Sequence, residues 1–150
     1  MVEDLCGFFH VGCSLEQLED FKDVHDIWWI SEWKYSSTAN NKVHNIITDL
    51  ADELGEDCTD EEYDELRQLY QDTIIKVLQD LREAGRLKNS QGDEIIYIIQ
   101  YADASDEEFE DVSFAQINPE KYIPLFENRF KAKSGENLYD FLLEKYSALK

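Results

Sequence analysis

The chain has 150 residues, of which 34 are Asp or Glu and 14 are Lys or Arg, so its formal net charge is −20. A charge of this sign repels nucleic acid and anionic membrane surfaces and attracts cationic partners. The hydrophobic content of 43% is that of a folded protein rather than a disordered one, and the length predicts one globular domain over residues 1–150.

The first third of the chain predicts short extended segments. LCGFFHVGC, residues 5–13, is typical of a short strand, and Ser14 with Gln17 three residues later predicts a brief capped helix. DIWWISEWKYSS, residues 26–37, predicts a strand or a strand that enters a loop. Because neighbouring side chains of a strand point to opposite faces, we expect one of Trp28 and Trp29 in the core and the other partly covered by a helix. For these two and Trp33 a contribution to a partner surface stays open.

Two helices follow. Apolar residues at helical spacing predict one over Asn41 to Leu54 and a longer one over Asp60 to Ala84. Thr59 with Glu62 has the spacing of a capping box, and Gly85 is a natural helix end.

The C-terminal half predicts one strand and two further helices. The apolar run Glu94 to Tyr101 indicates a strand buried on both faces, and Val112 to Ile117 a short strand or extended segment. Asn118-Pro119 opens a helix that Pro124 should shorten or kink, and residues 137–149 form a last amphipathic helix. The fold class expected from this order is α+β, a single domain with a small, mainly antiparallel sheet packed with about four to five helices. Its predicted core contains Ile47, Leu50, Leu66, Ile74, Leu78, Ile96 and Ile98.

No pattern in the sequence predicts an active site. Cys6, His10 and Cys13 lack a fourth zinc ligand at a plausible spacing, and the three cysteines, with Cys58 as the third, fit a reducing compartment. Phosphate-binding glycine loops and a GxSxG elbow are missing from the sequence. Without a signal peptide or a membrane-length apolar run, we expect a cytoplasmic, non-enzymatic protein that uses no metal, cofactor, nucleic acid or membrane.

The acidic residues are unevenly distributed. Ten carboxylates and no Lys or Arg lie from Asp49 to Glu65, and six more lie from Asp103 to Asp111. A helix dipole explains part of the first cluster, whereas the second falls in a predicted loop, where such charge favours docking to a basic surface. The predicted partner-binding residues are Asp57, Asp60, Glu61, Glu62, Tyr63, Glu65, Asp103, Asp106, Glu107, Glu108, Phe109, Glu110 and Asp111.

Several segments together resemble a known bacterial family. SLEQL, IWWISEWKY with its Glu32-Trp33-Lys34-Tyr35 ending, a helix pair leading to a Gly, and NPEKYIPLFENRF with the segment Ile117-Asn118-Pro119 resemble the family of domain of unknown function 4303 over roughly residues 14 to 130. The N-terminus departs from it, being shorter than the family's leading helix and strand. The family has no established catalytic residues, and the resemblance implies an immunity protein of contact-dependent or polymorphic toxin systems.

The expected function is therefore the neutralisation of a cognate cationic toxin, a nuclease, through the acidic clusters. A nuclease surface must be basic to hold its substrate, so carboxylates can occupy it in place of phosphates. The alternatives are an acidic, non-catalytic adaptor domain with a non-toxin partner, and an enzyme with a diffuse carboxylate site.

Overall fold

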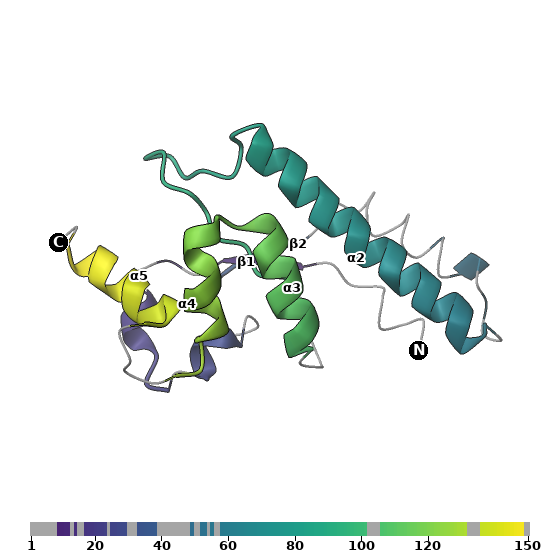
Figure 1. Cartoon of the computed structure of the whole chain (residues 1–150), viewed down its shortest axis with the longest axis horizontal. Coiled ribbons are helices and arrows are strands. Elements are labelled where there is room, and N and C mark those ends of the chain that lie inside the picture. Colours follow the sequence, from purple (N-terminus) through teal and green to yellow (C-terminus); the bar gives the residue numbers. More distant parts are fainter. Residues whose placement is uncertain are drawn as a thin grey trace. The chain divides into compact units, whose positions relative to one another are not determined.

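The computed structural model describes residues 9–12, 14, 17–23, 25–29, 33–38, 49, 52–53, 55, 58–101, 106–131 and 136–148 (Figure 1). The chain divides into two compact units, one of Met1–His10 with Ser36–Val77 and one of Val11–Tyr35 with Leu78–Lys150. The elements in chain order are β1 (Phe9–Gly12), η2 (Gln17–Asp20), η3 (Asp26–Trp28), β2 (Tyr35–Thr38), α2 (Asp60–Glu83), α3 (Glu107–Ile117), η5 (Glu120–Tyr122), α4 (Ile123–Glu127) and α5 (Leu138–Ser147).

The expected α+β class is wrong, because the described residues are mostly helical. Within them the only sheet is a two-stranded ribbon of β1 and β2. The predicted strand Glu94 to Tyr101 is not present: Glu94 makes one isolated bridge, to Lys88, and residues 95–101 carry no strand. Residues 112–117 belong to α3 rather than to a strand. β-Branched composition indicated strands, but the contacts that decide between strand and coil come from other parts of the chain.

The second unit holds an aromatic core. Its buried residues are Leu18, Ile27, Trp28, Phe114, Tyr122, Phe126 and Leu138. The rings of Phe114 and Phe126 stack at 3.9 Å, joining α3 to α4, and Trp28 meets Phe126 edge-on at 5.8 Å. The predicted core was centred elsewhere: Leu66, Ile74 and Leu78 are half-buried, Ile96 and Ile98 pack at the edge of the aromatic core, and Ile47 and Leu50 lie outside the described residues.

The tryptophans divide as the prediction required, but not on a strand. Trp28 is buried and Trp29 is 61% exposed, so the expected cover over the second ring is wrong. The pair lies at the end of η3, and the following strand β2 begins only at Tyr35. Trp33 is half-buried, and its indole N–H donates to the Ile27 carbonyl at 2.7 Å. The different exposures of the three tryptophans therefore follow from the helical turn of η3 and from the hydrogen bond of Trp33, and not from the two faces of a strand.

The long helix α2 matches the prediction for Asp60 to Ala84 closely. It ends at Glu83, and the positive φ of 69° at Gly85 lets the N–H groups of Gly85 and Arg86 bond the carbonyls of Arg82 and Leu81. This is the hydrogen-bond pattern of a Schellman ending. The preceding predicted helix, Asn41 to Leu54, lies largely outside the described residues, although Asp49, Asp52 and Glu53 are helical.

Asn118 holds Tyr97 in the irregular segment that takes the place of the predicted strand. Its side-chain amide accepts from the Tyr97 N–H at 2.9 Å and donates to the Tyr97 carbonyl at 2.7 Å. Arg82 adds a hydrogen bond to the Ile95 carbonyl at 2.8 Å and another to the Ile117 carbonyl. One side-chain amide therefore supplies the two hydrogen bonds that a neighbouring strand would have given the backbone of Tyr97.

The remaining helices follow the prediction. The segment after Pro119 is divided into η5 and α4, with Pro124 in the first turn of α4, so the proline interrupts the helix as expected. α5 covers Leu138–Ser147, and the Asn137 side chain caps it by accepting from the Asp140 N–H at 2.8 Å.

Candidate docking surface

The first turn of α2 carries an exposed group of carboxylates. Thr59 and Glu62 form the predicted capping box: the Glu62 N–H donates to the threonine hydroxyl at 3.2 Å, and the Thr59 N–H donates to the Glu62 carboxylate at 2.9 Å. Hydrogen bonds from the backbone and hydroxyl of Thr59 lower the pKa of Glu62, so the carboxylate stays ionised. The negative charges also complement the positive end of the helix dipole.

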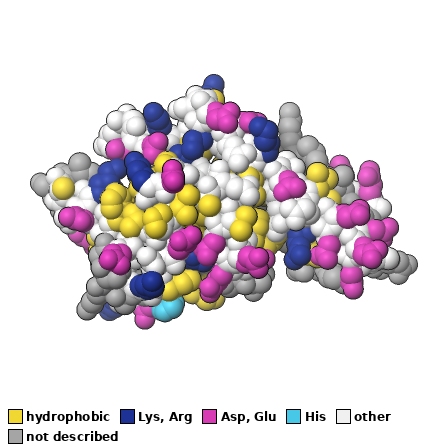
Figure 2. Space-filling view, in the orientation of Figure 1, with side chains coloured by type: hydrophobic (Ala, Val, Ile, Leu, Met, Phe, Trp, Pro, Cys, Tyr) yellow, Lys and Arg dark blue, Asp and Glu magenta, His cyan; other side chains and the backbone are white. Residues whose placement is uncertain are grey.

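The predicted docking residues of this helix are accessible. Asp60, Glu61, Glu62 and Glu65 are exposed, and Tyr63 is half-buried, while Asp57 lies outside the described residues. Figure 2 shows Asp and Glu side chains gathered over the N-terminal end of α2. Arg67 pairs with Asp64 at 3.2 Å, whereas Asp60, Glu61 and Glu65 are exposed to solvent.

The second acidic cluster is not a loop from Asp106 onwards. Asp106 is the N-cap of α3, accepting from the Phe109 N–H at 3.0 Å, and Glu107, Glu108 and Glu110 lie in the first turn. The helix dipole therefore accounts for part of this charge as well, and the prediction that the charge lies in a loop rather than at a helix start is wrong for Asp106 to Asp111. The sequence pattern missed this helix start because a short α3 with four acidic residues after its cap has little apolar periodicity.

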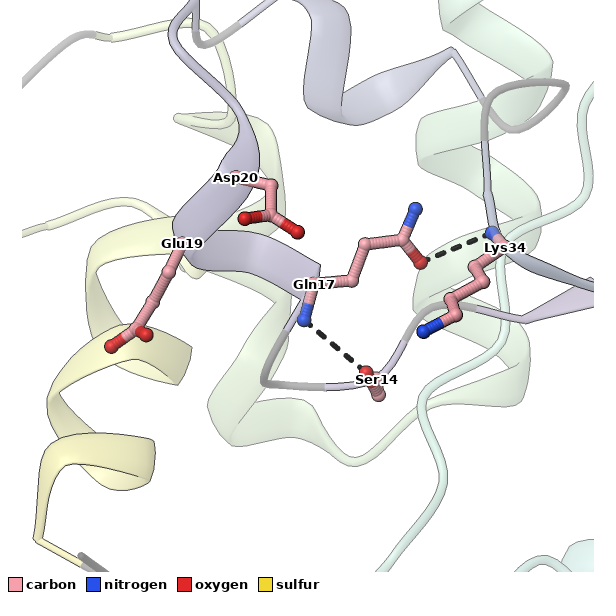
Figure 3. Close-up of a pocket in the computed structure, with 5 residues that line it drawn as sticks. All are labelled: Ser14, Gln17, Glu19, Asp20 and Lys34. Carbon is pink, nitrogen blue, oxygen red and sulfur yellow. Dashed lines mark hydrogen bonds between the residues drawn. The ribbon is translucent and has the colours of Figure 1, made fainter.

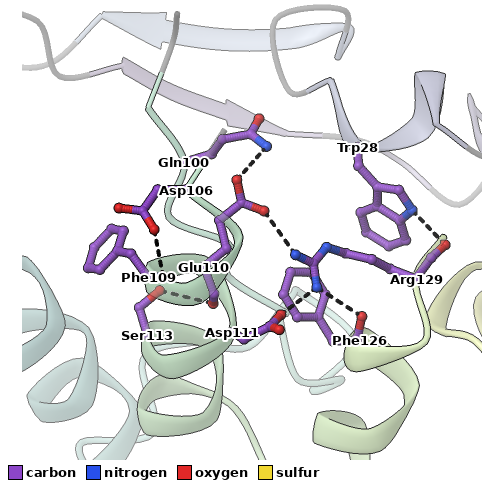
Figure 4. A network of polar contacts seen from close by, with 9 residues as sticks. All are labelled: Trp28, Gln100, Asp106, Phe109, Glu110, Asp111, Ser113, Phe126 and Arg129. Carbon is purple, nitrogen blue, oxygen red and sulfur yellow. Dashed lines mark hydrogen bonds and ion pairs between the residues drawn. The ribbon is translucent and has the colours of Figure 1, made fainter. Parts of the chain in front are cut away.

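Glu110 and Arg129 form a buried ion pair in the second unit (Figure 4). Their side chains are 4% and 2% exposed and meet at 3.3 Å. Arg129 also pairs with Asp111 and lies over the rings of Phe126 and Phe130, at 4.2 and 4.7 Å from their centroids. Burial raises the pKa of Glu110, which hydrogen bonding from Gln100 and the charge of Arg129 partly offset.

The predicted residues near α3 consequently divide into two kinds. Glu107 and Glu108 are exposed and face solvent. Asp106, Glu110 and Asp111 are engaged in the fold as cap and ion-pair partners, and the ring of Phe109 lies against Tyr101 at 5.7 Å. Asp103 lies outside the described residues. The first cluster and this one belong to different units of the chain.

A shallow pocket in the second unit offers little to a ligand. Ser14, Gln17, Glu19, Asp20 and Lys34 line about 210 Å³ (Figure 3). The Gln17 N–H donates to the serine hydroxyl at 3.2 Å, and the Gln17 side chain accepts from the Lys34 N–H at 3.0 Å. These bonds hold the turn of η2 against the segment before β2, so the polar groups have structural roles. The space is below the roughly 300 Å³ at which small-molecule sites begin.

Other features that sequence reasoning missed concern exposure and buried polar pairing. Leu69 and Val77 on α2 are 59% and 51% exposed, although apolar side chains at helical spacing normally face the core. Arg129 was not singled out, since an arginine beside two phenylalanines gives no spacing signal. The sequence alone does not show which apolar residues of a helix stay exposed, because this depends on the elements that pack against it.

Comparisons with models of known families, with curated proteins and with solved structures found no match. Among the described residues, no group of His, Cys, Asp and Glu side chains is arranged to hold a metal ion. The helices in that part of the chain are too short or too polar for any of them to cross a bilayer. Cys58 is half-buried, whereas Cys6, His10 and Cys13 have side chains outside the description.

Proposed function

We propose that the protein is a cytoplasmic immunity protein that binds and neutralises a cognate cationic toxin, a nuclease, by protein–protein contact. The observation that supports this most is the exposed acid on the first turns of α2, where Asp60, Glu61 and Glu65 face solvent on a rigid helix. The resemblance to the family of domain of unknown function 4303 points in the same direction.

The physical argument is charge complementarity. A net charge of −20 raises the association rate with a basic surface, and carboxylates on a helix can lie where the phosphates of a nucleic acid would bind. Packing these charges together destabilises the fold by self-repulsion, a cost that a binding role would explain. The structural roles of Asp106, Glu110 and Asp111 shift the weight of the proposal from α3 to α2.

The test uses the product of the toxin reading frame expected next to this gene. Purified toxin and protein are mixed, and both complex formation and nuclease activity are measured. We expect a stoichiometric complex in which the activity is lost. A toxin that retains full activity and does not bind would exclude this function and leave the adaptor alternative.

A further inference from the structure

Helix α2 carries apolar side chains that the described part of the chain leaves exposed. Of its 24 residues, only Gln71 and Ile75 are buried. An amphipathic helix of a globular protein normally buries a stripe of apolar residues along its whole length. Here Leu69 is 59% exposed and Val77 is 51% exposed. A large aliphatic side chain this open on a regular helix is common singly, but two on one face form a strip.

Leu69, Thr73 and Val77 follow each other at intervals of four residues, so they lie along one face of the helix. Two helical steps of this size span about 12 Å. The Thr73 hydroxyl donates to the Leu69 carbonyl at 2.7 Å, so its hydrogen-bonding need is met within the helix. The three positions therefore form one strip in which no side chain needs a hydrogen-bond partner from outside the helix. We call it the Leu69–Val77 strip.

A rim of carboxylates continues this strip towards the start of the helix and flanks it on one side. Glu65 and Glu62 stand four and seven residues before Leu69, in line with the strip, and Asp72 stands three residues after Leu69, beside it; all three are exposed. Lys76 lies on the same edge as Asp72, so the rim is most acidic towards the start of the helix. An apolar centre with a charged rim is the composition of a protein–protein contact site.

We infer that the Leu69–Val77 strip is the apolar centre of the docking surface, and that its occupant is a basic amphipathic helix of a partner protein. Such a helix places leucine-like side chains on the strip and lysines or arginines against the carboxylate rim. A second copy of this chain is disfavoured, because it would bring a rim of the same charge and another net charge of −20 against the first. This inference rests on the proposed function and names the part of the surface that makes the contact.

The probe is a synthetic peptide of Leu and Lys in which the leucines fall on one helix face. Its control has the same composition in an order that spreads leucine around the helix. We expect the native protein to bind the first peptide at least tenfold more tightly than the second, measured by calorimetry at physiological salt. Equal affinity for the two peptides, or no binding of either, overturns the inference.

Substitutions locate the contact. Leu69→Ala and Val77→Ala shorten the strip without reducing helix propensity, so circular dichroism should be unchanged. Each should weaken binding of the amphipathic peptide about tenfold or more, as expected for residues at the centre of an interface. Val112→Ala is the matched control, since Val112 is 50% exposed on α3, and it should bind as the native protein does. Native affinity in the α2 variants overturns the inference, and so does a dimer of the native protein that Leu69→Ala dissociates.

The same variants separate this inference from the proposed function. If the toxin binds Leu69→Ala and Val77→Ala with native affinity, the strip is not the contact, and the immunity role stands. If the peptide binds as expected and the toxin does not bind at all, the strip stands, and the toxin is not the partner.

Discussion

Replacing Arg129 by Met should remove most of the stability that the buried network contributes. The change leaves the Glu110 carboxylate, 4% exposed, without its cation and removes the guanidinium from the rings of Phe126 and Phe130. Breaking a buried pair by removing one partner typically costs about 3–5 kcal/mol, because the other charge stays buried.

The free energy of protonating Glu110 gives a second estimate of the stability that this variant loses. With an ordinary pKa of 4.5, taking up a proton at pH 7 costs (7 − 4.5) × 1.36, or about 3.4 kcal/mol. The carboxyl can escape its unpaired charge at this cost, so the charge penalty cannot greatly exceed it. The lost cation–π contacts add about 1 kcal/mol, and we expect a total of about 4 kcal/mol at pH 7.

The stability lost in Arg129→Met should depend on pH through the protonation of Glu110. Burial without Arg129 raises the folded-state pKa of Glu110 further, so in this variant the carboxyl favours folding most when it is protonated. That contribution is fully present below pH 4.5 and is lost as the pH rises through the raised folded-state pKa. The deficit of Arg129→Met relative to the native protein should therefore shrink as the pH falls from 7 towards 4.5.

Urea unfolding followed by tryptophan fluorescence measures this, since Trp28 packs against Phe126 and donates to the Arg129 carbonyl at 3.1 Å. Adding Glu110→Gln to Arg129→Met should recover about 2–3 kcal/mol by removing the buried charge. Lys121→Met is the control, since it breaks an exposed pair with Glu94 and should leave the midpoint unchanged. A deficit below about 1 kcal/mol, or one that does not change with pH, would refute the assignment of a buried charge pair.

Two further predictions concern backbone pairing in the second unit. Asn118→Ala should cost about 2 kcal/mol of stability and speed amide hydrogen exchange at Tyr97, because both backbone groups of Tyr97 lose their partner. Asn118→Asp keeps an acceptor and should protect the Tyr97 amide partly. Native exchange rates at Tyr97 in both variants would contradict the account. Asp106→Ala should cost about 1 kcal/mol by uncapping α3, whereas Asp106→Asn keeps an acceptor for the Phe109 N–H and should be near native; equal losses would show that charge rather than the cap matters.

How far the sequence predicted the fold depended on whether the signal was local. The capping box of Thr59 and Glu62, the ending at Gly85 and the interruption at Pro124 are set by neighbouring residues, and all three are present. Residues 94–101 were predicted as a strand from composition. The backbone of Tyr97 is instead paired by Asn118, which lies 21 residues away, and no local pattern indicates such a contact.

The candidate site shows the same division. Clusters of carboxylates are visible in the sequence, but their roles depend on packing: Asp106 caps a helix, Glu110 is buried against Arg129, and Glu61 remains exposed. The cap at Asp106 could have been suspected, because an Asp before two glutamates is a common helix start. The buried pair could not, since its partners lie 19 residues apart.

The central claim is that exposed acid on α2 docks a basic partner, and a salt series of association rates tests it most directly. Three proteins are mixed with the toxin at increasing ionic strength. They are the native protein, an α2 variant in which Glu61, Glu65 and Asp72 are changed to amides, and a control variant that combines Glu120→Gln with Glu127→Gln. The two control positions are exposed and lie outside α2. We expect the native rate to fall steeply with salt, because exposed charges are screened over about 8–10 Å at physiological strength. The α2 variant should associate more slowly with a flatter salt dependence, while the control follows the native protein. Equal rates for all three proteins, with no dependence on salt, would contradict the claim.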